Sequence, residues 1–92
     1  MNQADAYKYL SVELNTWLAK PFDELERSVG QTHSNRCRAE DAAEYVVEIS
    51  VDWYSREEGA LLVSGMAALA SCGPLHRMDR SFVVTQNGIR SA

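Results

Sequence analysis

Large hydrophobic side chains recur with helical spacing near the N-terminus. They follow one another at steps of three, four, three and one residues, at Tyr7, Leu10, Leu14, Trp17 and Leu18. This spacing puts all five on one side of an α-helix, and polar residues fill the other side. The pattern predicts an amphipathic helix that packs its apolar side against the rest of the fold.

The segment after this helix begins with Pro21. Proline cannot donate in a helix interior but fits a first helical turn, so residues 21–27 either kink the first helix or begin a second one. Gly30 ends this segment, and residues 31–35 are polar. Residues 39–43 suit a short helical turn, so we interpret residues 31–43 as a connector.

The hydrophobic period changes to two over residues 45–54. Apolar and aromatic residues occupy alternate positions, and the positions between them include Glu48, Ser50 and Asp52. This alternation predicts a strand with one apolar face, formed by Tyr45, Val47, Ile49, Val51 and Trp53. Residues 55–59 are polar and end in glycine, which predicts a hairpin loop that leads into an antiparallel neighbour.

Residues 60–70, ALLVSGMAALA, carry no charge. A strand of this composition needs cover on both faces, which predicts the central strand of the sheet. A buried helix is the alternative, because Ala, Leu and Met favour helices. Gly65 costs about 1 kcal/mol in a helix interior, and the hairpin signal before the segment favours the strand.

Residues 81–85 form a β-branched and aromatic run that predicts a third strand. A turn signal, Asn87-Gly88, follows it, and only four residues remain to form a returning strand. Either that strand is vestigial or the natural domain continues further. The sequence therefore predicts one α+β domain over residues 1–92, with an N-terminal amphipathic helix packed on a three-stranded antiparallel β-meander.

Three segments carry a resemblance to a known family. They are Val51-Asp52-Trp53, residues 59–65 (GALLVSG) and residues 80–86 (RSFVVTQ). Together they resemble the sheet of nuclear transport factor two-like domains, which have the cystatin-like fold. The resemblance implies a sheet-to-sheet dimer, often with a pocket between helix and sheet. It implies no particular activity, because many unrelated functions use this fold.

Composition and charge narrow the classes of partner. The chain has 92 residues, 46% hydrophobic and 24% charged, with nine Lys and Arg against thirteen Asp and Glu. These values are typical of a globular domain, and the net charge of -4 argues against nucleic acid or anionic lipid as the main partner. The sequence shows no signal peptide and no apolar run long enough for a membrane span, so we expect a cytoplasmic protein.

The cysteines and histidines occur as two pairs with the same spacing: His33, Cys37, Cys72 and His76. Each pair has the spacing of neighbours on one helical turn, and an antiparallel pairing of residues 45–54 with residues 60–70 brings both pairs to one end of the sheet. Two thiolates and two imidazoles form a complete tetrahedral zinc set. The alternatives are a disulfide between Cys37 and Cys72, and free thiols, which a chain without an export signal favours.

Four arginines are expected at the same end of the sheet, where they suit an anion: Arg36, Arg38, Arg77 and Arg80. The alternative is ordinary ion pairing with the acidic residues beside them in the sequence. Catalysis has little support, since the chain lacks a glycine-flanked nucleophile, a phosphate loop and a His-Glu-x-x-His helix. Glu48 and Asp52 share a strand face, where carboxylates are usually solvated.

The uncharged central segment suggests the function. One helix covers only one face of a small sheet, so a second copy of the chain is expected on the other face or at a sheet edge. We predict a homodimeric interaction or regulatory module without catalytic activity or an obligatory cofactor, which associates through Leu62, Met66 and Ala68. The alternatives are a zinc-stabilised domain and a small-ligand binder or enzyme with a pocket lined by Tyr7, Trp17, Trp53 and Phe82.

Overall fold

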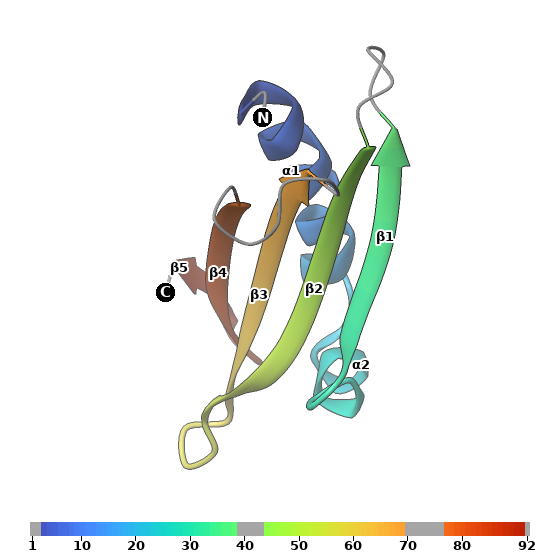
Figure 1. Cartoon of the computed structure of the whole chain (residues 1–92). Coiled ribbons are helices and arrows are strands. Elements are labelled where there is room, and N and C mark those ends of the chain that lie inside the picture. The colour runs from blue at the N-terminus through green and yellow to red at the C-terminus, as the bar shows by residue number, and fades with distance from the viewer. Residues whose placement is uncertain (1–2, 39–43, 70–76, 92) are drawn as a thin grey trace.

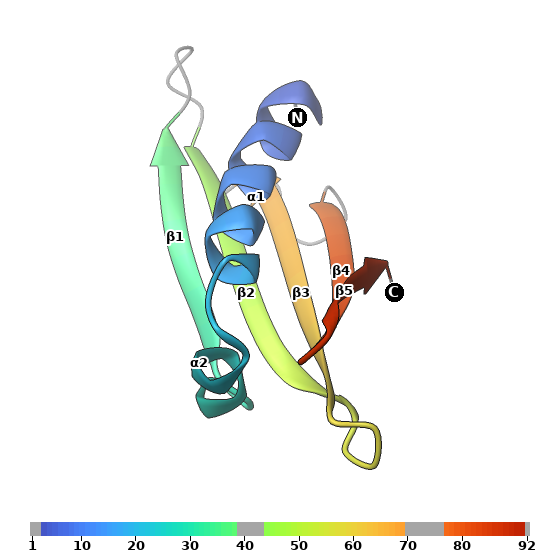
Figure 2. The same ribbon diagram turned by 180° about the vertical axis from the view of Figure 1, so that it is seen from behind.

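The computed structural model describes residues 3–38, 44–69 and 77–91 (Figure 1). Two helices precede five strands in the described chain: α1 (Gln3–Leu18), α2 (Phe22–Arg27), β1 (Thr32–Arg38), β2 (Glu44–Ser55), β3 (Ala60–Leu69), β4 (Arg77–Thr85) and β5 (Gly88–Ser91). The strands form one antiparallel sheet in the order β1-β2-β3-β4-β5. Helix α1 lies across one face, the helix-covered face (Figure 2). The opposite face, seen in Figure 1, is called the open face.

The alternation of β2 decides which of its side chains enter the core. Tyr45, Val47, Ile49 and Val51 are all buried beneath α1, as the sequence predicts. The register pairs Val47 with Ala67, Ile49 with Gly65 and Val51 with Val63, so the same face of β3 is buried too. Residues 60–69 therefore form the central strand rather than a helix, because both neighbouring strands supply its hydrogen bonds.

Helix α1 packs on the sheet through four of its five predicted residues, since Leu10 and Leu14 are in the core and Trp17 and Leu18 pack against it. Ala6, Leu10 and Leu14 are buried, whereas Tyr7 is 48% exposed and lies outside the core. The close approach needs Gly65, because a Cβ built there would lie 2.7 Å from Leu10 Cδ1 and 3.0 Å from Leu14 Cγ. The absence of a side chain at Gly65 therefore lets the leucines of α1 lie close to the sheet.

The predicted three-stranded meander has five strands in the structure. The predicted connector contains β1, whose residues are exposed except for the half-buried Cys37. An edge strand of this kind carries no hydrophobic alternation, so the hydrophobic period does not predict it. The short return strand forms as β5, and its two-residue loop is Gln86–Asn87 rather than Asn87–Gly88, because Thr85 pairs with Gly88.

Proline begins a second helix rather than kinking the first. Pro21 precedes α2, and its carbonyl accepts hydrogen bonds from the N–H groups of Glu24 and Leu25. Leu25 is completely buried and anchors this short helix to the core. Residues 39–43, where the sequence suggests a helical turn, lie outside the described residues.

Candidate functional site

The open face has an apolar centre, which Ser64 interrupts between Leu62 and Met66. Val46 pairs with Ala68 across β2 and β3, and Leu62 pairs with Val83 across β3 and β4. Met66 lies between these pairs. Ala68 is 8% and Val83 1% exposed, while the other three are half-buried. The structure therefore brings the predicted interface residues Leu62, Met66 and Ala68 onto one face of one strand.

Charged side chains of both signs lie around and within this centre, since Glu48 and Asp79 flank Met66 in the register and Asp52 pairs with Leu62. Arg36 on β1 forms an ion pair with Glu44 on β2 (Nη1 to Oε1, 3.0 Å). On β4, Arg77 pairs with Asp79 (Nε to Oδ2, 3.1 Å). All four side chains are at least one third exposed, so these pairs contribute little to stability. Their effect is to leave the rim polar without a strong field of one sign.

A row of hydroxyl groups crosses the open face. The register aligns one hydroxyl residue from each of four strands: Thr32, Ser50, Ser64 and Ser81. The outer two pairs are hydrogen-bonded, each with its oxygens 3.2 Å apart. The three serines of this row line a shallow groove of about 340 Å³ together with Glu48, Met66 and Asp79.

The four arginines predicted to hold an anion do not share one face. Arg77 and Arg80 are three residues apart on β4, and alternation therefore sends them to opposite faces. Arg77 lies on the open face with Arg36 and Arg38, whose strand positions are also on that side. Arg80 pairs in register with Gly65 and lies on the helix-covered face. A single four-arginine anion pocket is therefore wrong.

The predicted zinc residues are only partly described. His33 and Cys37 lie on β1, and four strand residues span about 13 Å rather than one helical turn. Within the described ranges, no three His, Cys, Asp or Glu side chains are grouped to hold a metal ion. Cys72 and His76 lie outside the described residues. The zinc set therefore stays a prediction, whereas Cys37 is a free cysteine in this structure.

The surroundings of His33 and Cys37 favour a structural role over a chemical one. The His33 ring lies 4.5 Å from the Trp17 ring of α1, centroid to centroid. Cys37 is a free thiol on the same side of β1. Burial raises the pKa of this thiol, and the negative charge of Glu13 raises it further. A raised pKa keeps the thiol protonated near neutral pH, which disfavours a nucleophilic role.

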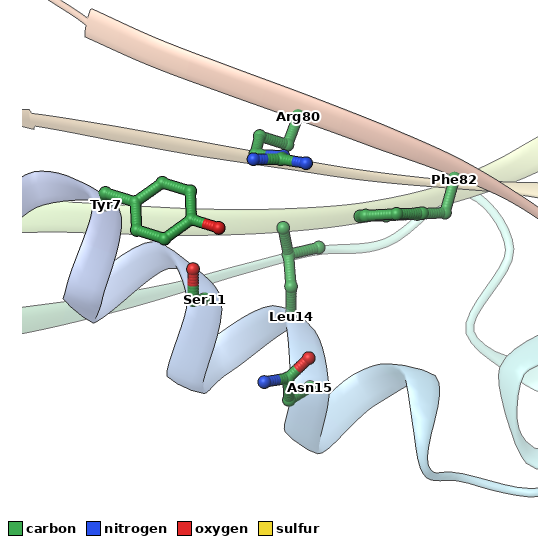
Figure 3. A pocket seen from close by; sticks show the side chains of 6 residues that line it. All are labelled: Tyr7, Ser11, Leu14, Asn15, Arg80 and Phe82. Atoms are coloured by element: carbon green, nitrogen blue, oxygen red, sulfur yellow. The ribbon is translucent and has the colours of Figure 1, made fainter. Parts of the chain in front are cut away.

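The predicted aromatic pocket divides into separate places. Tyr7 and Phe82 line a cavity of about 210 Å³ between α1 and β4, together with Ser11, Leu14, Asn15 and Arg80 (Figure 3). The other two aromatic residues do not line it. Trp17 contacts His33, and the ring of Trp53 lies 5.6 Å from the Arg56 guanidinium carbon. We call the cavity the Arg80 pocket.

Two aromatic rings hold the Arg80 side chain. Its guanidinium carbon lies 5.4 Å from the centroid of the Tyr7 ring and 5.9 Å from that of Phe82. Both distances are within the range of cation–π attraction. Figure 3 shows the guanidinium above Leu14, with the Ser11 hydroxyl pointing into the same space. Sequence reasoning did not connect Arg80 with Tyr7, although Arg80 interrupts an apolar series along β4.

Glu48 and Asp52 do not form a catalytic pair. They lie four residues apart on β2, so about 13 Å separates their Cα atoms. That distance is too great for the two carboxylates to share a proton.

No helix among the described residues is long and apolar enough to cross a membrane.

No protein-family model, curated protein or solved structure matches this chain. The resemblance to nuclear transport factor two-like domains therefore stays a prediction.

Proposed function

We propose that this domain is a non-catalytic interaction module that pairs with a second copy of itself through the open face. One observation carries the proposal. The central strand β3 presents Leu62, Met66 and Ala68 on the open face, and no helix in the described part of the chain lies over them (Figure 1). A partner sheet would remove the remaining apolar area from water, which favours association.

The arrangement of the open face resembles a protein interface. An apolar centre surrounded by a polar rim is the usual anatomy of such contacts. Cations and carboxylates occur together on both sides of the centre, as Arg36 with Glu44 and Arg77 with Asp79. A two-fold contact places identical surfaces opposite each other, so a rim of mixed sign avoids the repulsion that a rim of one sign would cause.

The sheet edges are less suited to pairing. At one edge β5 has only four residues, and at the other β1 carries Arg36 and Arg38. Short edge strands and charged side chains both discourage strand addition. The N–H of Val51 donates to the carbonyl of Gln31, so the alternation of antiparallel bonds directs the Ser34 N–H away from β2. Removing that outward N–H therefore tests whether two chains pair through the β1 edge.

The test is sedimentation velocity at micromolar concentration. We expect a dimer for the unaltered chain and a monomer for Met66→Lys. In the register Met66 lies between Glu48 and Asp79, so the new ammonium has acidic neighbours in the monomer, but it would be buried in a dimer. Val12→Lys is the matched control, because Val12 on α1 is 58% exposed.

The control variant should remain dimeric, and circular dichroism should show that both variants are folded. A monomeric unaltered chain would contradict the proposal. So would a Met66→Lys variant that dimerises as strongly as the control.

A further inference from the structure

We propose that the Arg80 pocket binds a small organic carboxylate with an apolar body. The pocket lies between α1 and β4 on the helix-covered face, on the other side of the sheet from Leu62 and Met66 (Figures 2 and 3). Ligand binding there and self-association through the open face are thus independent.

The first argument is the position of the cation. Alternate residues of β4 on the helix-covered face are Met78, Arg80, Phe82 and Val84, so the exposed Arg80 interrupts an otherwise apolar series beside α1. Departures from a local pattern are expected where a residue serves a function. The residue paired with Arg80 in the register is Gly65, which carries no charge that Arg80 would balance.

The second argument is the state of the guanidinium. Tyr7 and Phe82 attract it through their ring faces, which orient the side chain without replacing a carboxylate acceptor. Among the described residues, no Asp or Glu forms an ion pair with Arg80. Arg36, Arg77 and Arg90 each have one, whereas Arg27, Arg38 and Arg56, like Arg80, have none within the described ranges. The planar fork of N–H donors is thus available for a bidentate contact with a carboxylate.

The third argument is the rest of the lining. Ser11 and Asn15 lie four residues apart on α1, which puts a hydroxyl and an amide on the same side of the pocket. Leu14 and the two aromatic rings provide apolar walls. One cation with apolar walls suits a monoanion with an apolar body better than a phosphate. The volume of about 210 Å³ admits only a small molecule.

The experiment uses benzoate as the probe and benzamide as its uncharged analogue. Two-dimensional ¹H–¹⁵N NMR of the full chain follows the amides of Ser11, Asn15 and Phe82 up to about 10 mM ligand, which detects millimolar dissociation constants. We expect saturable shifts with benzoate and none with benzamide. Arg80→Gln should weaken benzoate binding at least tenfold, whereas the matched control Arg77→Gln should leave it unchanged.

A second pair of variants keeps the inference testable if Arg80→Gln does not fold. Asn15→Asp puts a carboxylate into the pocket to compete for Arg80 and should weaken benzoate binding at least tenfold. Thr16→Asp makes a similar change on the exposed side of α1 and should have no effect. Absence of saturable shifts, equal binding of benzamide, or unchanged binding in Asn15→Asp would overturn the proposal.

Discussion

Replacing Gly65 with alanine would show how closely α1 lies on the sheet. The added Cβ would lie 2.7 Å from Leu10 Cδ1, 3.0 Å from Leu14 Cγ and 3.1 Å from Ile49 Cδ1. Carbon atoms in good contact are about 3.5–4.0 Å apart, so all three contacts are too short. Because these three side chains are buried, none moves aside without disturbing other core contacts.

The expected cost follows from two opposing effects. Forcing an extra methyl into a packed core costs about 1–3 kcal/mol, whereas replacing glycine within a strand gains about 0.5–1 kcal/mol. The Gly65→Ala variant should thus lose about 1–2 kcal/mol of unfolding free energy. For a domain of this size, each kcal/mol lowers the melting temperature by about 4–8 °C.

Urea unfolding followed by tryptophan fluorescence is a suitable assay, with an unchanged m value as the sign of an unchanged unfolding transition. Leu10→Val lacks the Cδ1 atom and should cost about 1 kcal/mol by itself. Combined with Gly65→Ala, it should cost less than the sum, with a coupling of at least about 0.5 kcal/mol.

The matched control for this coupling is Gly59→Ala in the β2–β3 loop. Gly59 has a φ of 65° and nothing within 4 Å of a built Cβ, so alanine there costs only backbone strain. Leu10→Val and Gly59→Ala should therefore be additive. A Gly65→Ala variant as stable as the unaltered chain, or additive with Leu10→Val, would refute the close-approach argument.

Two further predictions concern β1. Ser34→Pro removes only an outward N–H, so the dimer should persist in sedimentation velocity, and its loss would indicate edge pairing instead. In a Cys72→Ser chain, the pH profile of Cys37 alkylation should have its midpoint above that of a short peptide thiol, because the pKa is raised, and Glu13→Gln should lower it. Above about pH 8.5 the Cys37 thiol of the unfolded chain loses its proton while the folded chain keeps it, so the free energy of unfolding should fall as the pH rises further. An alkylation midpoint equal to that of the peptide thiol would contradict both the raised pKa and this loss of stability.

The local pattern of the sequence was sufficient for the elements that have one apolar face. The alternation in residues 45–54 identified β2 and the side that meets the helix, and the spacing in α1 identified Leu10 and Leu14 as core residues. The placement of Leu62, Met66 and Ala68 on one strand face also followed from alternation alone. These features depend on side-chain period and on turn chemistry, which short segments carry by themselves.

Other features depend on contacts between distant segments. The strand β1 is polar throughout and is a strand only because β2 supplies its hydrogen bonds, so its sequence alone predicted a connector. Alternation along β4 separated Arg80 from Arg77, but only the pairing of β4 with β3 and the packing of α1 brought Arg80 to Tyr7.

The sequence by itself determined the α+β class, the amphipathic first helix and the central position of β3, because hydrophobic period is a local property. Only the tertiary structure decided that the sheet has five strands, that Gly65 admits α1, and that an arginine without an ion pair among the described residues meets two aromatic rings. Pairing and packing join residues far apart in the chain, and no local pattern records which ones meet.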